Sequence, residues 1–121
     1  MDSLQDLKQE LQKFAAVRQW DQFHSPKNLV MALSGEVGEL TEHFQWLSED
    51  QSSSLDDKTH TAVAEEIADV QIYLIRLADK LDIDIIQAAK GKILSNAVKY
   101  PIEKFKGSAK KYTDNKEPSI P

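Results

Sequence analysis

The stretch Leu33-Ser34-Gly35-Glu36-Val37-Gly38-Glu39-Leu40 carries two acidic residues one helical turn apart, beside a row of large apolar side chains. The chain repeats this arrangement thirty residues later, in Val63-Ala64-Glu65-Glu66-Ile67-Ala68-Asp69-Val70. Apolar residues at alternating steps of three and four predict that each stretch forms an amphipathic helix. Two such helices packed along their apolar faces bring their acids together at the edge of the shared core. The repeat therefore predicts a cluster of four carboxylates from two helices.

The four acids are Glu36 and Glu39 on the first helix, and Glu66 and Asp69 on the second. A lone Glu-x-x-Glu pair is typical of a solvated helix surface, but four clustered carboxylates repel one another unless cations neutralise them. Oxygen ligands without cysteine favour Mg²⁺ or Mn²⁺ over zinc. A di-iron centre is the structural alternative, but it requires Glu-x-x-His on two helices, where this chain has Glu39 and Asp69. We interpret the cluster as a magnesium site.

The composition is that of a soluble globular protein, since 40% of the 121 residues are apolar and 29% are charged. This length predicts a single domain, placed at residues 1–105, followed by a tail at 106–121 that is flexible or contacts a partner chain. No signal peptide and no membrane-spanning run is recognisable, so no membrane partner is expected. The absence of cysteine fits a reducing compartment, and a cytoplasmic location is expected.

The net charge of −5 argues against general binding to nucleic acid, whose phosphates repel an acidic protein. Lysines nonetheless gather in the C-terminal third, at Lys90, Lys92, Lys99, Lys104, Lys106, Lys110 and Lys111. Such a region is either a solvated face, which is the commoner case, or a contact for a compact polyanion such as a triphosphate. Charge alone leaves both interpretations open.

Four amphipathic helices account for most of the sequence, and no stretch has the alternation of a β-strand. The helices are predicted at residues 3–18, 26–47, 59–81 and 85–99. Ser3, Ser25 before Pro26, and Asp84 are suited to cap the helices that they precede. The polar segment 48–57 is predicted to be an exposed loop. The sequence therefore predicts an all-α fold, a four-helix bundle.

The inner faces of this bundle follow from the apolar spacing. They comprise Val30, Leu33, Val37, Leu40, Phe44 and Leu47, then Val63, Ile67, Val70, Leu74, Leu77 and Ala78, and finally Ile86, Ala89, Ile93 and Ala97. Gly35 and Gly38 interrupt the second helix and cost about 1 kcal/mol each in helix propensity relative to alanine. Glycines at such positions indicate close packing or room for a ligand, and either would suit a crowded ion site.

Three rings lie in the short connector before the second helix, at Trp20, Phe23 and His24. For any one of them, the commoner interpretation is a side chain that plugs the end of the bundle. As a group they are also suited to wall a pocket for a flat ring.

The acidic repeat and its surroundings resemble the MazG-like, all-α nucleoside triphosphate pyrophosphohydrolases. Glu36-x-x-Glu39, a gap of 26 residues (40 to 65) and Glu66-x-x-Asp69 resemble the metal-binding signature of that family, and are most similar to its dCTP pyrophosphatase branch. The resemblance runs from Phe14 to Tyr112 and includes the segments 18–29, 35–40, 44–46 and 65–70, and Lys92, Asn96, Tyr100 and Pro101.

The resemblance implies an enzyme that cleaves a dNTP, in particular dCTP, between the α and β phosphates with Mg²⁺, releasing a monophosphate and pyrophosphate. Such an activity serves to clean the nucleotide pool. By position, Glu36, Glu39, Glu66 and Asp69 would bind metal, and Glu36 or Glu39 would accept the proton of the attacking water. The resemblance implies that the phosphates contact Lys92, Asn96 and Tyr100, and that the base and sugar contact Trp20, His24, Trp46 and Tyr73. It also implies a homo-oligomer, a tetramer built from dimers, with helices shared between subunits.

One departure concerns the residue before the first acid. The broader family often has a further acid there, where this chain has Gly35, which fits the dCTP branch and leaves the number of metal ions open. The preferred base is open as well, among dCTP, dATP, other dNTPs and modified deoxycytidine triphosphates. The alternative from another class is a non-catalytic helical assembly module with an acidic, cation-binding face.

Overall fold

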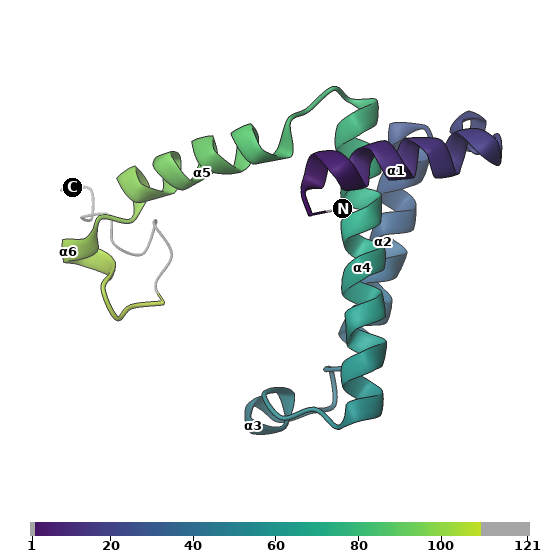
Figure 1. The fold of residues 1–121 in the computed structure, drawn as a ribbon. Coiled ribbons are helices and arrows are strands. Elements are labelled where there is room, and N and C mark those ends of the chain that lie inside the picture. The colour runs from purple at the N-terminus through teal and green to yellow at the C-terminus, as the bar shows by residue number, and fades with distance from the viewer. Residues whose placement is uncertain (1, 110–121) are drawn as a thin grey trace, which may run out of the picture. The chain divides into compact units, whose positions relative to one another are not determined.

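The computed structural model describes residues 2–109, and within this range the regular structure is helical throughout (Figure 1). The elements are α1 (Leu4–Val17), the short 3-10 helix η1 (Asp21–Phe23), α2 (Pro26–Glu42), α3 (Glu49–Ser52), α4 (Asp57–Lys80), α5 (Ile85–Lys99) and α6 (Ile102–Phe105). The predicted all-α class is confirmed. Residues 110–121, which make up most of the predicted tail at 106–121, lie outside the described part. In residues 2–109, no helix combines the length and the apolar character that crossing a membrane requires.

Polar side chains cap the long helices at the residues that the sequence indicates. Ser3 Oγ accepts a hydrogen bond from the Asp6 amide at 3.1 Å, and Ser25 Oγ accepts one from the Asn28 amide at 3.1 Å. The side chain of Asp84 caps α5 in the same way. Each cap satisfies an amide of the first turn that has no partner inside the helix. α1 and α5 therefore begin where the sequence predicts.

α2 ends at Glu42, earlier than the predicted end at Leu47. Beyond Glu42, the amide of Phe44 donates to the carbonyl of Thr41 at 2.9 Å, and the amide of Leu47 donates to the carbonyl of Phe44 at 2.9 Å. Bonds to the carbonyl three residues back tighten the chain and interrupt the α-helical pattern. The apolar spacing of the second helix thus continues past its end, into a series of turns.

A one-turn helix, α3, lies inside the segment 48–57 that the sequence predicts to be a loop. Ser48 Oγ accepts a hydrogen bond from the Gln51 amide at 3.2 Å, while Gln51 Oε1 accepts one from the Ser48 amide at 2.9 Å. This reciprocal pair is a capping box, and its Ser-x-x-Gln pattern stands in the sequence. The prediction of a loop was therefore wrong at these residues. α4 also begins at Asp57 rather than Thr59, because Asp56 caps it.

α2 and α4 lie side by side, and α1 lies across this pair near the end of α4 (Figure 1). The buried apolar residues come from all three helices: Ala15 from α1, Leu29 from α2, and Val63, Ile75 and Ala78 from α4. These side chains form the core of the first compact unit, which comprises residues 1–83.

The predicted inner faces are only partly covered within one chain. Val63 and Ala78 are buried as predicted, whereas Val37 is 44% exposed and Ile67 is 54% exposed. A pair of helices covers only one side of each apolar face, so the other side remains open. A Cβ atom at Gly35 or Gly38 would also meet no atom of the described part of the chain within 4 Å. These glycines therefore do not serve close packing within this chain.

α5 and α6 belong to a second compact unit, which begins at Asp84. None of the residues of α5 is buried, and Ile93, on its predicted inner face, is 66% exposed. Within this unit, the rings of Tyr100 and Phe105 pack edge to face with centroids 4.8 Å apart, which joins α6 to the end of α5. Within the first unit, the packed helices of the predicted bundle are α1, α2 and α4. The sharing of helices across an oligomer stays a prediction, as does the domain boundary at residue 105.

Candidate active site

The packing of α2 against α4 brings together three of the four predicted acids. One carboxylate oxygen from each of Glu36, Glu39 and Glu66 lies within 4.8 Å of the others. Glu36 and Glu39 share a face of α2 because they are one turn apart, and this face meets Glu66 on α4. Residues far apart in the sequence therefore converge on one point, as the repeat predicts.

The three carboxylates form an acidic cluster, and no ion pair of the described residues brings a cation to it. The Oε2 atoms of Glu36 and Glu66 are buried and have no hydrogen-bond partner among residues 2–109. Burial, the neighbouring carboxyls of Glu66 and Glu39, and the charge of Asp69 together raise the pKa of Glu36 to about 7. Buried carboxylate oxygens without donors are costly unless a cation binds them. The donor set, three carboxylates without nitrogen or sulfur, fits a hard divalent cation.

Asp69 lies one turn after Glu66 on α4 and is half-buried. Its charge acts on the pKa of Glu36, so it lies near the cluster. The oxygens that lie within 4.8 Å of one another nevertheless come from Glu36, Glu39 and Glu66. A direct metal contact from Asp69 stays a prediction.

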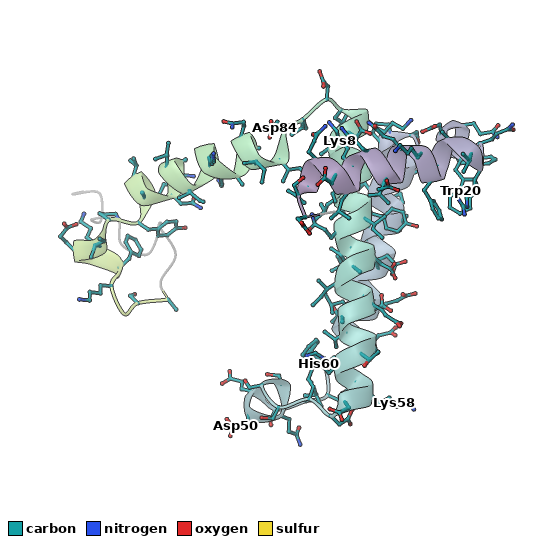
Figure 2. The ribbon with its side chains drawn as sticks, viewed as in Figure 1. Lys8, Trp20, Asp50, Lys58, His60 and Asp84 are labelled. Atoms are coloured by element: carbon teal, nitrogen blue, oxygen red, sulfur yellow. The ribbon has the colours of Figure 1, made fainter. Side chains whose placement is uncertain are left out.

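The connector between α1 and α2 presents its rings at the surface. Trp20, which is labelled in Figure 2, is 42% exposed, and Phe23 is exposed as well, so neither is a buried plug. The Trp20 ring packs edge to face against Phe14, with centroids 5.6 Å apart, and against His24 at 6.3 Å. The guanidinium of Arg18 lies 3.5 Å from the centre of the Phe14 ring. The connector is therefore an ordered wall with exposed ring surface.

An ionic network that the sequence analysis did not identify holds this connector against α4. The buried Arg76 donates from Nη2 to Asp21 Oδ1 at 2.7 Å, and Nη2 also lies 3.2 Å from His24 Nδ1. Lys80 donates to the same Asp21 oxygen at 3.0 Å. The only signal in the sequence was an arginine flanked by apolar residues on α4 and an acid between the rings. Their pairing across 55 residues is not readable from spacing.

Trp46 and Tyr73 complete the predicted contacts to base and sugar. Trp46 follows the end of α2 and is 86% exposed, while Tyr73 is half-buried on α4, one turn after Asp69. Near Trp46, a hollow of about 390 Å³ lies between the end of α2 and the start of α4, with His43, Leu47 and Asp56 among its lining residues.

Trp20 and Trp46 lie beyond opposite ends of α2, which has 17 residues. A helix of that length spans about 25 Å, at 1.5 Å per residue. One chain by itself therefore does not place both tryptophans on a single base. A pocket that contains both requires more than one subunit.

The predicted phosphate contacts Lys92, Asn96 and Tyr100 all belong to the second unit. Lys92 is exposed and Asn96 is half-buried on α5, and the amide of Tyr100 donates to the carbonyl of Asn96 at 2.8 Å. The three residues thus share the C-terminal half of one helix and its end. Their contact with phosphate stays a prediction.

The chain is similar to known proteins over most of its length. Residues 31–114 match the model of the MazG-like family. The dCTP pyrophosphatase 1 of Mus musculus is 45% identical over 114 residues, covering 93% of this chain and 67% of the relative. The dCTP pyrophosphatase 1 of Homo sapiens is 40% identical with the same coverage. The crystal structure of a pyrophosphatase from Archaeoglobus fulgidus superimposes with a TM-score of 0.76 and 43% identity, covering 80% of this chain and 91% of that protein.

Proposed function

Because this chain belongs to the MazG-like family, we propose that it cleaves dCTP into dCMP and pyrophosphate in a magnesium-dependent reaction. It is a nucleotide pyrophosphohydrolase, because relatives named dCTP pyrophosphatase 1 match it over 93% of its length. The observation that carries the proposal is the convergence of Glu36, Glu39 and Glu66, two of whose oxygens are buried and find no hydrogen-bond donor within residues 2–109. dCTP is the expected substrate among the dNTPs.

Glu36, Glu39 and Glu66 would hold Mg²⁺, with Asp69 as the fourth ligand. When bound, Mg²⁺ neutralises charge on the phosphates and makes water a better nucleophile. The carboxylates fix the place of the reaction between α2 and α4. Glu36 or Glu39 accepts a proton from the water as its oxygen bonds to the α-phosphorus. The bond from that phosphorus to the bridging oxygen then breaks, and pyrophosphate leaves in line with the attack.

The nucleotide site is completed by a second subunit in this proposal. Trp20 and His24 lie before the start of α2, and Trp46 lies beyond its end. A base that touches both groups therefore lies between two chains. The open apolar residues Val37 and Ile67 flank the acids and are available for packing against a second copy. We propose that two such dimers form a tetramer. Lys92, Asn96 and Tyr100 contact the phosphates in this proposal. The expected location of the enzyme is the cytoplasm.

The test is release of pyrophosphate from each of the four dNTPs in the presence of Mg²⁺. We expect pyrophosphate from dCTP first, and no product from Glu36→Gln or Asp69→Asn. Glu65→Gln is a matched control, because Glu65 is exposed, precedes Glu66 and stands outside the cluster. Release of orthophosphate, or full activity in both site variants, would contradict the proposal.

A further inference from the structure

Arg76 is the most buried charged side chain in the described part of the protein, with 4% of its surface exposed. Its two terminal nitrogens contact different partners: Nη2 donates to Asp21 Oδ1 at 2.7 Å, and Nη1 lies 3.7 Å from Asp79 Oδ2. Asp79 in turn accepts a hydrogen bond from Gln12 Nε2 at 2.9 Å, which ties the group to α1. The guanidinium is therefore held from several sides and has little freedom to rotate.

The same Nη2 lies 3.2 Å from His24 Nδ1. A guanidinium has only N–H donors and no acceptor, so Nδ1 must offer a lone pair for this contact to be attractive. A neutral imidazole carries one proton, which must then be on Nε2. The contact therefore selects one of the two tautomers of His24.

The surroundings of His24 keep its ring neutral. Burial lowers the pKa of His24, and the charges of Arg76 and Lys80 lower it further, against an opposing contribution from Asp21. Near neutral pH the ring is therefore uncharged, with a single N–H group at Nε2. The half-buried ring lies edge to face with Trp20, at 6.3 Å between centroids.

We propose that Arg76 is a positioning residue, which fixes His24 as the Nε2–H tautomer so that this N–H donates to an oxygen of the nucleobase. The choice of the base over the phosphates follows from position, since Trp20 offers a ring for stacking and the acids that hold the phosphates lie further along α2. The nucleobase part of the inference rests on the proposed function. The tautomer part does not.

The first test observes the tautomer directly, in the full chain with ¹⁵N-labelled histidine. Long-range ¹H–¹⁵N spectra at neutral pH should give His24 the nitrogen shifts of a pure Nε2–H tautomer, while the exposed His60 gives the averaged shifts of a freely exchanging ring. Arg76→Met should move His24 to averaged shifts, and Arg76→Lys, which keeps a donor, should partly restore them. An Nδ1–H tautomer or averaged shifts in the wild-type protein would overturn the proposal, whether or not the variants fold.

The second test measures dCTP binding by calorimetry with Ca²⁺ in place of Mg²⁺, so that turnover does not interfere. His24→Asn keeps an oxygen near the position of Nδ1 for Arg76 but lacks the outer donor, and should weaken binding about tenfold, as expected for one lost hydrogen bond. His24→Gln places an N–H₂ near the position of Nε2 and should bind nearly as the wild type does. His60→Asn is the matched control. Inorganic tripolyphosphate should bind all four proteins equally.

The outcomes separate this inference from the proposed function. Unchanged dCTP binding in His24→Asn overturns the donor role, and an equal loss for tripolyphosphate overturns the assignment to the base. If the wild-type protein binds dCTP but releases no pyrophosphate, the proposed function fails and the role of His24 stands. If dCTP does not bind, the nucleobase part fails together with the proposed function, and the spectra still decide whether Arg76 fixes the ring.

Discussion

Glu36 on α2 and Glu66 on α4 place carboxylate oxygens within 4.8 Å of each other, and the Oε2 atom of each is buried without a hydrogen-bond donor from the described residues. Neither residue has a cation beside it among the ion pairs of the described chain. The two carboxylates therefore repel each other in the folded protein, and a divalent cation bound between them would offset this repulsion.

We expect Mg²⁺ to raise the melting temperature of the wild-type protein by a few degrees, because an ion that binds only the folded state stabilises it. Glu36→Gln should respond less to Mg²⁺, since it removes one ligand. Without Mg²⁺, the same variant should melt at a higher temperature than the wild type, since it removes repulsion. Thermal melts with and without Mg²⁺ measure both effects.

Glu65→Gln serves as the control for charge, since it removes one negative charge from the same helix outside the cluster. It should respond to Mg²⁺ as the wild type does. If all three proteins gain equally from Mg²⁺, the acids form a solvated face, as in the alternative of a non-catalytic assembly module.

Much of this site was readable from the sequence, because helical periodicity converts spacing into position. The register of Glu36 and Glu66 in two apolar stripes predicted their convergence, and caps such as Ser25 and Asp84 fixed where helices begin. Periodicity carries no information on which side of a stripe is covered. The exposure of Val37 and Ile67 therefore could not be predicted.

The ion pair of Arg76 and Asp21 could not be predicted from the sequence either. It depends on a turn at Gln19, with φ of 55°, that sends the connector back toward α4. Glutamine rarely adopts the left-handed conformation, so the sequence does not indicate a turn at this position. An ion pair between elements 55 residues apart becomes visible only when the path of the connector is known.

Gln19 also provides a test of stability away from the acids. The amide of Trp20 donates to the carbonyl of Ala15 at 2.9 Å and the amide of Gln19 donates to that of Ala16 at 3.0 Å, the pattern of a Schellman motif, in which glycine is favoured. Gln19→Gly should stabilise the protein by about 1 kcal/mol, because it relieves the left-handed conformation. Chemical denaturation measures the change. Gln19→Ala keeps the strain and should gain nothing, and an equal gain in both would contradict this explanation.

His24 should make the protein less stable as the pH falls. Its pKa is lowered from 6.5 in the folded state, so the unfolded chain takes up a proton first. The contribution of His24 is therefore complete above pH 6.5 and is lost as the pH falls through 6.5 toward the folded value. Asp21 acts in the same direction only at lower pH, since its pKa is lowered from 3.8 by Arg76 and Lys80.

The measurement is the difference in melting temperature between the wild type and His24→Asn at pH 7.5 and pH 5.5. This difference should shrink or reverse at the lower pH. The melting temperature of His60→Asn should differ from that of the wild type by the same amount at both pH values. Comparison with a variant is necessary because Glu36, with its raised pKa, contributes the opposite slope to every protein in the series. A constant difference across this range would show that His24 does not titrate differently on unfolding.

Trp20 and Trp46 should separate stability from binding, because their surroundings differ. Trp46 is 86% exposed, so Trp46→Ala should change the free energy of unfolding of a single subunit by no more than about 0.5 kcal/mol. Trp20 packs against Phe14 and His24, so Trp20→Ala should lower stability measurably. In the proposed function both variants should raise the KM for dCTP, by about tenfold for a lost stacking contact. An unchanged KM in Trp46→Ala would remove Trp46 from the nucleotide site, and with it the need for a second subunit to complete the pocket.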